Sequence, residues 1–243
     1  MKTEECRPDR LGLGRLLIYQ DEMVFKFTVD PILAAAFLRA RREEYILDMG
    51  TGSGVIPLWL AGYRDYHNVT GLELQPEVAD LARANVRLNA LEERIKIVMG
   101  DIRNLPAELR GLQFPWIVSN PPYWSAETRH LTGNPVLDRA KFELTCTIED
   151  VVKAARRLAK GNGRLIMVHL PERLPDILGA FRQYGFEPKR LLMVHAKPAE
   201  PPNRIVIEGQ QGGKPHLNVL APLYIRDGHG EFTSEMMRIY EGK

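Results

Sequence analysis

Short apolar runs that alternate with helical patterns constrain the fold of this chain most. Five of these runs have the length of single strands, and they lie at 45–48, 69–73, 95–98, 116–119 and 164–168. Between the second and the third run, residues 76–88 open with proline and carry apolar side chains at helical spacing. Strands that alternate with helices form βαβ units, so the pattern predicts an α/β fold with a mostly parallel sheet.

The last two expected strands, 188–194 and 204–208, depart from this alternation because their connection, 197–202, has no helical pattern. Two strands joined by a short loop must be antiparallel, since a parallel return needs a longer crossover. We therefore expect a seven-stranded, mostly parallel sheet with one reversed strand in its C-terminal hairpin. This arrangement is typical of the Rossmann-like class-I methyltransferase fold.

The segment before the first strand, 1–44, is expected to be a small extension of the domain. Residues 16–19 and 24–27 have the pattern of two hairpin arms. Asp30 followed by Pro31 is a typical helix start, with the aspartate as N-cap and the proline at the first helical position.

The second half of the chain carries further helix signals. Residues 147–150 resemble a capping box, and residues 174–184 predict a helix that Gly185 ends. The stretch 212–243 begins with glycines and a proline and closes with a short helical pattern, so we expect a C-terminal tail. Neither end has the features of a separate domain, and we expect one methyltransferase domain over 1–243.

The composition argues against several classes of protein. No run reaches the roughly 18 apolar residues of a transmembrane helix, and the polar start does not resemble a signal peptide. The two cysteines, Cys6 and Cys146, lie far apart and show no metal-ligand spacing. We therefore expect a cytoplasmic protein with reduced thiols, without a membrane partner or a bound metal.

The net charge of +2 neither requires a nucleic-acid partner nor excludes one. Local clusters matter more, because each contact with a phosphate neutralises a charge locally. Basic residues gather at 39–42, at 153–160 and around Arg129. Each cluster is either a solvated helix face or part of a surface that binds RNA.

A glycine-rich turn, Asp48-Met-Gly50-Thr51-Gly52-Ser-Gly54, directly follows the first expected strand. Glycine adopts positive φ readily and lets a ligand approach the main chain closely. Ligands of open α/β sheets bind at the carboxyl ends of strands, which is where this turn lies. The turn by itself fits a site for S-adenosylmethionine, a dinucleotide site or a purely structural connection.

Acidic residues follow the next two strands. Glu73 ends the second strand, a position from which a carboxylate accepts hydrogen bonds from ribose hydroxyls. Asp101, followed by Ile102, comes after the third strand, where an aspartate can accept from an adenine amino group. Alone, Glu73 fits a dinucleotide site equally well, and Asp101 fits a loop cap equally well. The series Asp48, Glu73 and Asp101 at three successive strand ends favours S-adenosylmethionine as the cofactor.

The tetrapeptide Asn120-Pro121-Pro122-Tyr123 follows the fourth expected strand. Consecutive prolines fix φ and restrict the residue before them, so Asn120 and the Pro121 carbonyl are held rigidly. Together these two groups can accept both hydrogens of an exocyclic amino group. Tyr123 supplies a flat face on which a base or an amide can stack. For the tetrapeptide alone, a diproline turn without a function is the alternative.

A planar nitrogen is a poor nucleophile because its lone pair is delocalised. Acceptors that bind its two N–H groups favour a more electron-rich nitrogen as the methyl bond forms. Orientation can contribute roughly 7–11 kcal/mol, so such a reaction requires no metal, nucleophilic serine or catalytic cysteine. We therefore expect Asn120, Pro121 and Tyr123 to be the catalytic residues of a methyl transfer to nitrogen.

The whole pattern resembles a family of enzymes that methylate N6 of adenine 37 in a valine tRNA, within the Asn-Pro-Pro-Tyr group of amino methyltransferases. Besides the tetrapeptide, the resemblance rests on Gln20, 25–30, 222–226 and 230–233. It implies S-adenosylmethionine as the cofactor and a tRNA anticodon loop as the substrate. It also implies that Asp30 helps to wall the cofactor pocket.

Several residues are expected to contact the RNA because they lie near loop ends on the site face or in the tetrapeptide. They are Pro122, Tyr123, Arg129, Lys197, Asn203 and Arg204. One segment departs from the family pattern: many relatives carry Ala-Arg-His-Glu where this chain has residues 140–143, with Lys141 and Phe142 at the second and third positions.

Two other functions fit the same tetrapeptide. A glutamine-N5 methyltransferase of peptide chain release factors usually carries a sizeable helical N-terminal domain, whereas only residues 1–44 precede the first strand here. A DNA methyltransferase is disfavoured because no segment is large enough for target recognition. A catalytically silent RNA-binding relic is the third possibility, and the intact Asp48, Glu73 and Asn120 argue against it.

Overall fold

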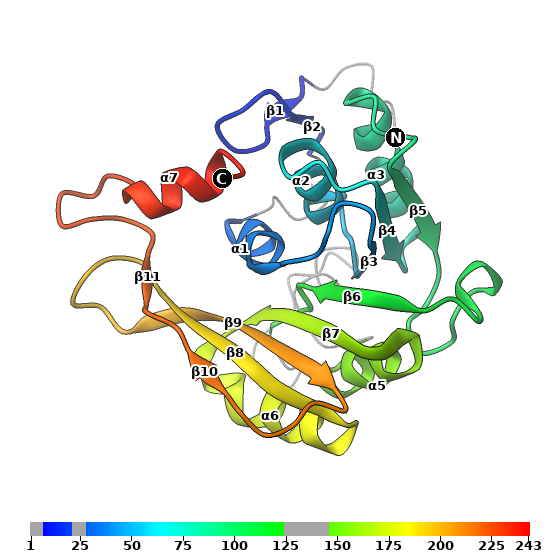
Figure 1. The fold of residues 1–243 in the computed structure, drawn as a ribbon. Helices are drawn as coiled ribbons and strands as arrows, with labels where there is room; N and C mark the ends of the chain where they lie inside the picture. Colours follow the sequence, from blue (N-terminus) through cyan, green and yellow to red (C-terminus); the bar gives the residue numbers. More distant parts are fainter. Residues whose placement is uncertain (1–6, 21–27, 124–145) are drawn as a thin grey trace, which may run out of the picture.

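The computed structural model describes residues 7–20, 28–123 and 146–243. One large sheet dominates this part of the chain (Figure 1). Its strands in chain order are β3 (Tyr45–Met49), β4 (Asn68–Glu73), β5 (Ile95–Met99), β6 (Phe114–Ser119), β7 (Ala159–His169), β8 (Phe186–His195), β9 (Pro202–Gln211), β10 (Asn218–Val219) and β11 (Leu223–Tyr224).

The order of the strands across the sheet is β10-β8-β9-β7-β6-β3-β4-β5, with β11 also paired to β8. The neighbours from β5 to β7 all pair in parallel. Only β9 runs against both of its neighbours, β7 and β8. The predicted reversed strand in a C-terminal hairpin is therefore confirmed.

The predicted number of seven strands is too small, because the sheet of the described chain has nine. The two additional strands come from the expected tail, where β10 and β11 pair in parallel with the outer edge of β8. An edge strand exposes unpaired N–H and C=O groups, and the tail satisfies part of that edge. Two-residue strands without a clear apolar pattern leave little trace in a sequence.

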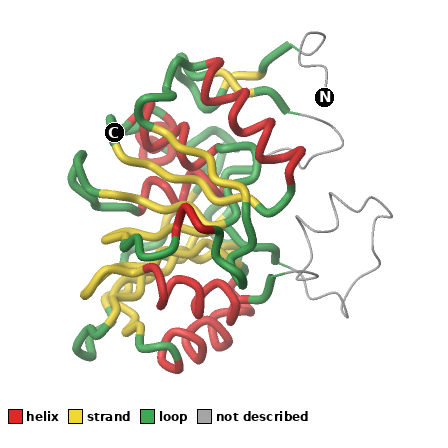
Figure 2. The backbone as a smooth tube through the Cα atoms, turned by 90° about the vertical axis from the view of Figure 1, so that its right-hand side faces the viewer, coloured by secondary structure: helices red, strands yellow, loops and turns green. Residues whose placement is uncertain are grey.

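Helices cover both faces of the sheet, as the view in Figure 2 shows. Their bounds are α1 (Asp30–Phe37), α2 (Val55–Tyr63), α3 (Pro76–Leu88), α5 (Ile148–Leu158), α6 (Leu174–Gln183) and α7 (Ser234–Tyr240), with short 3-10 turns at Ala107–Leu109 and Pro171–Arg173. Among the residues described here, no helix is both long and apolar enough to cross a membrane.

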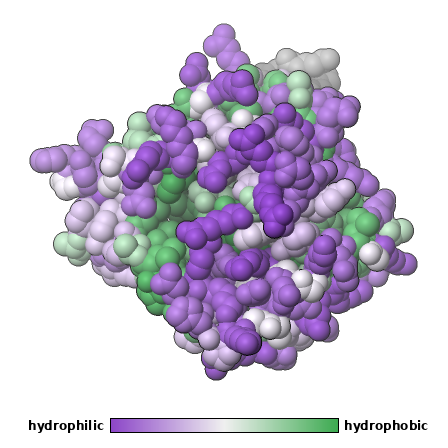
Figure 3. Space-filling model, viewed as in Figure 1, coloured by the Kyte–Doolittle hydropathy of each residue, from purple (hydrophilic) through white to green (hydrophobic). Residues whose placement is uncertain are grey.

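Alternation of side chains along each strand divides the core into two layers. Ile46, Trp116 and Val118 pack in one layer with α1 and α2, whereas Leu47 and Ile117 pack in the other with α5 and α6. A strand buried on both faces reads as a continuous apolar run, which is the pattern of the central strands. Hydrophilic side chains cover most of the face seen in Figure 3, and apolar ones show mainly on its left, near β8 and β11.

Two local predictions hold in the structure. Helix α3 has the bounds expected from its opening proline and its apolar spacing. Thr147 and Asp150 form a full capping box at the start of α5, in which the Asp150 N–H donates to the Thr147 hydroxyl at 3.1 Å.

The N-terminal hairpin differs from the expectation. The strand β2 (Leu17–Ile18) pairs with β1 (Asp9–Arg10), and the expected second arm, 24–27, lies outside the described residues. Side chains of α3 act as a further partner for this segment. Asn85 Oδ1 accepts from the Tyr19 N–H at 2.6 Å, and its Nδ2 donates to the Tyr19 carbonyl at 3.1 Å.

The predicted capping role of Asp30 is wrong. Helix α1 begins at Asp30 with Val29 as its N-cap, and the hydroxyl of Thr28, not the Asp30 carboxylate, accepts from the Asp30 N–H at 3.3 Å. The Asp30 carboxylate instead accepts from the Tyr123 hydroxyl and forms an ion pair with Arg204. A buried carboxylate gains more from a cation and a phenol than from the helix N–H groups, so tertiary partners override the local signal.

A buried ion cluster connects the hairpin to α1. Glu208 on β9 is fully buried and pairs with Arg164 on β7 and, at 2.9 Å, with Arg190 on β8. The Arg190 guanidinium lies 3.8 Å from the centre of the Phe37 ring and donates to the Phe37 carbonyl at 2.8 Å. One carboxylate thereby holds three strands and the last turn of a helix in place.

We predict that Glu208→Ala lowers the free energy of unfolding by about 3–5 kcal/mol, because it leaves a buried arginine without its counter-ion. Urea denaturation followed by circular dichroism measures this loss. Glu200→Ala is the matched control, since Glu200 pairs with Lys197 on an exposed turn and its removal should leave stability nearly unchanged. Equal effects of the two substitutions would contradict the prediction.

Candidate cofactor and active site

The glycine-rich turn lies between the end of β3 and the start of α2. Gly50, Gly52 and Gly54 have φ values of 78°, 56° and 88°, which residues with a side chain rarely adopt. The N–H groups of Gly50 and Thr51 both donate to the Leu72 carbonyl at 2.9 Å, which fastens the turn to β4. A Cβ atom on Gly50 or Gly52 would meet nothing within 4 Å, so the main chain of the turn borders open space.

Glu73 ends β4 and braces this turn. One of its carboxylate oxygens accepts from the Gly52 N–H at 2.9 Å, and the other accepts from the Gln75 N–H at 2.9 Å. Burial raises the pKa of Glu73, while these two hydrogen bonds oppose the rise. Each oxygen keeps a lone pair that can accept from a ligand hydroxyl.

Asp48 and two of its neighbours are buried acceptors without partners. Burial raises the pKa of Asp48 to about 7, although the nearby Thr51 hydroxyl lowers it. Within the described residues, neither oxygen of Asp48 nor the Thr51 hydroxyl completes a hydrogen bond. The side-chain oxygen of Gln75 is in the same state. Buried acceptors without donors are costly, so this strand end is suited to a ligand that brings donors.

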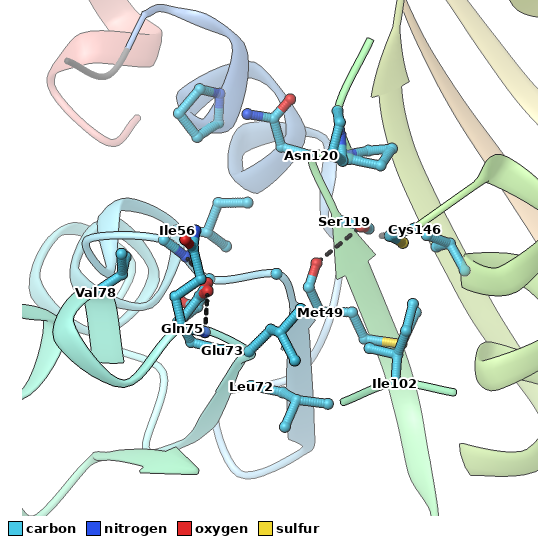
Figure 4. Close-up of a pocket in the computed structure, with 18 of the residues that line it drawn as sticks. Met49, Ile56, Leu72, Glu73, Gln75, Val78, Ile102, Ser119, Asn120 and Cys146 are labelled. Carbon is cyan, nitrogen blue, oxygen red and sulfur yellow. Dashed lines mark hydrogen bonds between the residues drawn. The ribbon is translucent and has the colours of Figure 1, made fainter. Parts of the chain in front are cut away.

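One pocket joins the glycine turn to the Asn-Pro-Pro segment, as Figure 4 shows. Its wall includes many of the predicted site residues: Gly50, Thr51, Gly52, Glu73, Asp101, Ile102, Asn120, Pro121 and Pro122. Asp48 and Gly54 lie in the same turn but outside the wall. The parallel pairing of β3 with β4 and β6 explains the convergence, since it brings three strand ends to one edge.

The pocket wall also contains residues that the sequence did not single out. Gln75 lies two positions after Glu73, and Ser53 lies within the glycine turn. Cys146 and Val151 reach the pocket from the start of α5. Proximity to Glu73 was a usable signal for Gln75. No local signal exists for α5, because only the packing of this helix against the sheet brings it to the pocket.

Asp101 is on the pocket wall, but Arg103 engages its carboxylate. The Arg103 N–H and Nε donate to one Asp101 oxygen at 2.8 and 3.0 Å, and Nη2 donates to the other at 2.6 Å. This pairing with Arg103 lowers the pKa of Asp101 despite partial burial. The adenine contact expected for Asp101 stays a prediction, and it requires Arg103 to share one of these oxygens.

Tyr123 contacts side chains from α1, from the segment after β6 and from β9. Its hydroxyl lies 2.6 Å from Asn120 Oδ1 and 2.9 Å from Asp30 Oδ2 of α1. Arg204, from β9, approaches the same Asp30 oxygen with its Nε at 3.0 Å and lies over the Tyr123 ring. The His169 ring packs 5.1 Å from the Tyr123 ring, between centroids. Burial lowers the pKa of His169 to about 3, so it packs there as a neutral imidazole.

The other expected RNA contacts separate into two groups. Lys197 lies in the turn between β8 and β9 and Asn203 at the start of β9, at the same edge of the sheet as the pocket. Lys197 pairs with the exposed Glu200 at 3.1 Å. Arg129 and Phe142 lie outside the described residues. Among the described residues, no three His, Cys, Asp or Glu side chains gather in a way that would hold a metal ion.

The strand order, the reversed β9 and a pocket at the carboxyl ends of β3, β4 and β6 define a class-I methyltransferase fold. A predicted O-methyltransferase from Agrobacterium tumefaciens has the same fold, with a TM-score of 0.72 and 23% identity over 88% of this chain and 96% of that one. The chain belongs to the methyltransferase small-domain family, which matches residues 31–175.

Two relatives resemble the chain more closely in sequence, and both are named tRNA1(Val) (adenine(37)-N6)-methyltransferase. The protein from Porphyromonas gingivalis is 32% identical over 68% of this chain, and the matched part spans 65% of that protein. The protein from Dickeya chrysanthemi is 26% identical over 98% of this chain and 94% of its own length. The resemblance that the sequence motifs indicated is confirmed.

We predict that Asp48 makes the ligand-free protein less stable as the pH rises. Asp48 keeps a proton in the folded state up to about pH 7, whereas the unfolded chain releases it near the ordinary aspartate pKa of 3.8. Unfolding therefore releases this proton between these values, and raising the pH favours unfolding, by about 4 kcal/mol at most. Urea denaturation at pH 5 and pH 8 should show about 3 kcal/mol of this loss in the wild type and a smaller loss in Asp48→Asn.

Asp80→Asn is the control for this comparison, because Asp80 is exposed and pairs with Arg83. It should keep the pH dependence of the wild type. An Asp48→Asn variant with the wild-type pH dependence would contradict the assignment of the raised pKa to Asp48.

Proposed function

We propose that this chain transfers the methyl group of S-adenosylmethionine to the exocyclic N6 of adenine in tRNA, at adenine 37 in the anticodon loop of a valine tRNA. The observation that carries the proposal is a single pocket with the glycine turn at one end and Asn120 with Pro121 at the other. The relative from Dickeya chrysanthemi, whose name states this activity, matches 98% of the chain and supports the choice of nitrogen.

The polar groups around the glycine turn fit S-adenosylmethionine. This cofactor carries an ammonium group and ribose hydroxyls, which are donors, and the pocket wall supplies acceptors on Thr51 and Gln75 that lack partners among the described residues. Glu73 has lone pairs left for ribose hydroxyls. Gly50 and Gly52 leave room for close approach to the main chain. S-adenosylmethionine, when bound, supplies an electrophilic methyl group on a sulfonium.

The chain's own contribution is to hold the nitrogen that receives the methyl group. The Asn120 side-chain carbonyl and the Pro121 backbone carbonyl accept the two hydrogens of the amino group, and they orient its lone pair toward the pocket. Ser119 supports this segment, because its hydroxyl donates to the Met49 carbonyl at 2.8 Å and ties β6 to β3. Orientation by rigid acceptors contributes to the rate, and the proton that the methylated nitrogen has to lose passes to solvent after the transfer.

The substrate base has to leave the stack of the anticodon loop to reach this segment. Lys197 and Asn203, at the turn beside the pocket edge, are proposed to contact RNA, together with Arg129. Arg204 is already paired with Asp30, which disfavours a contact with phosphate. Stacking of the base on Tyr123 stays a prediction. The side chains of Arg204 and His169 already pack against that ring and cover part of its surface. We place the reaction in the cytoplasm, where tRNA is available.

A glutamine side chain of a release factor is the second candidate substrate. The two acceptors, Asn120 and Pro121, hold an amide nitrogen as well as an adenine amino group, because both present two N–H hydrogens in a plane. The two substrates are distinguished by offering each in turn to the same protein.

We predict that Asn120→Ala still binds S-adenosylmethionine, with a Kd within about threefold of the wild type, but loses about 10²–10³-fold in kcat. The substitution removes one of the two acceptors that act on the reacting nitrogen, and loss of one such hydrogen-bonding group costs a factor of this size. Calorimetry measures binding, and transfer of labelled methyl to total tRNA measures kcat. Mass spectrometry of the nucleosides should identify N6-methyladenosine.

Asn218→Ala is the matched control, since Asn218 is exposed on the short edge strand β10. It should leave both binding and transfer unchanged. Wild-type transfer to a release-factor peptide instead of tRNA would establish the second candidate, and binding of S-adenosylmethionine without transfer to either substrate would indicate a silent relic.

A further inference from the structure

Four side chains from three distant parts of the sequence form one continuous line of polar contacts that ends at the pocket. Arg204 Nε lies 3.0 Å from Asp30 Oδ2, this oxygen lies 2.9 Å from the Tyr123 hydroxyl, and the hydroxyl lies 2.6 Å from the Asn120 side-chain amide. The Asp30 side chain is almost completely buried. The centre of the line therefore lies in the protein interior, and the line ends on Asn120, to which the proposed function assigns the reacting nitrogen.

The number of hydrogens available in this line restricts which group donates and which accepts in each contact. The Tyr123 hydroxyl has one hydrogen, and burial together with the charge of Asp30 raises its pKa well above 10, so the hydroxyl keeps that hydrogen. Asp30 accepts only, because it faces the Arg204 guanidinium. The side-chain atom of Asn120 placed toward the hydroxyl is Oδ1, at 2.6 Å, so this oxygen and Asp30 Oδ2 compete for one hydrogen.

Only one arrangement satisfies every group. The Tyr123 hydroxyl donates to the charged Asp30 oxygen, which is the stronger acceptor. Asn120 then turns its amide nitrogen toward Tyr123 and donates to the phenol oxygen. The oxygen and the nitrogen of an amide are nearly equal in size, so the surrounding hydrogen bonds decide which one faces Tyr123. With the nitrogen toward Tyr123, the carbonyl oxygen of Asn120 points away from it.

We propose that Arg204, Asp30 and Tyr123 form a positioning relay that fixes the Asn120 amide with its carbonyl oxygen toward the reacting nitrogen. This proposal rests on the proposed function of the same site. Each donor in the relay serves one acceptor: Arg204 donates to Asp30, Tyr123 donates to Asp30, and Asn120 donates to Tyr123. The opposite orientation of Asn120 would present N–H groups to the N–H groups of the substrate.

Packing supports the relay at its centre. The Arg204 guanidinium carbon lies 5.3 Å from the centre of the Tyr123 ring, on its face, and the His169 ring lies 5.1 Å from it. The buried Asp30 carboxylate raises the pKa of the Arg204 guanidinium even though burial lowers it, which keeps the cation in place. Tyr123, Asp30 and Arg204 therefore act on Asn120 as positioning residues.

The kinetic test compares Tyr123→Phe, Asp30→Asn and their combination. Tyr123→Phe keeps the ring and removes the hydroxyl, so kcat should fall about 10- to 100-fold, as expected for a misplaced reacting group. The KM for tRNA and the Kd for S-adenosylmethionine should stay within about threefold. Asp30→Asn should lose less, because an amide oxygen still accepts from the phenol. The double variant should be no slower than Tyr123→Phe, since both changes break the same line.

Tyr184→Phe is the matched control, because the Tyr184 hydroxyl also donates to a carboxylate, Glu149, but on an exposed surface. Its kcat should stay within about twofold of the wild type. Three results would overturn the relay: a Tyr123→Phe variant with kcat within twofold, losses that multiply in the double variant, or a loss confined to the KM for tRNA.

A second measurement does not depend on the substrate. In protein labelled with ¹⁵N-asparagine, the Asn120 side-chain signals are identified by their disappearance in Asn120→Ala. Tyr123→Phe should shift these signals and speed their exchange with solvent, while Tyr184→Phe leaves them in place. Unmoved Asn120 signals in Tyr123→Phe would overturn the relay. Absence of methyl transfer from the wild type to any tRNA would overturn the proposed function alone, and the relay would be judged by these signals.

Discussion

The parallel pairing of β3 with β4 on one side and β6 on the other determines where every functional group lies. Asp48 pairs in register with Gly71 and with Val118, so the three strands end at one level. Parallel strands that end together bring their following loops to one edge, and here those loops are the glycine turn, the segment after Glu73 and the Asn-Pro-Pro segment. The pocket is a consequence of this register.

Buried carboxylates serve two different purposes in this fold. Glu208 and Asp30 each face arginine, and they connect the C-terminal hairpin to α1. Among the described residues no side chain pairs with Asp48, and burial raises its pKa to about 7. The arginine partners of the first two carboxylates offset part of the cost of their desolvation. The third carboxylate has no such partner among the described residues, and it lies in the turn that borders the pocket.

Predictions that depend on neighbouring residues in the sequence were confirmed, whereas some that depend on distant residues were wrong. The bounds of α3 and the capping box of Thr147 depend on neighbouring residues, and the sequence was enough to locate them. The helix cap expected from Asp30 failed, because Tyr123 and Arg204 bind this carboxylate from 93 and 174 residues away. Strands β10 and β11 were missed since two-residue strands form only where an edge is available.

By itself, the sequence determined the α/β class, the reversed hairpin, the glycine turn and the Asn120–Tyr123 segment. Each of these depends on local periodicity or on the restricted φ of glycine and proline. Only the tertiary structure decided that Arg103 occupies the carboxylate of Asp101, and that the hydroxyl of Tyr123 lies between Asp30 and Asn120. Partners of a polar side chain are selected by distance in space and by the cost of burying an unpaired group, and neither quantity is encoded in the spacing of residues along the chain.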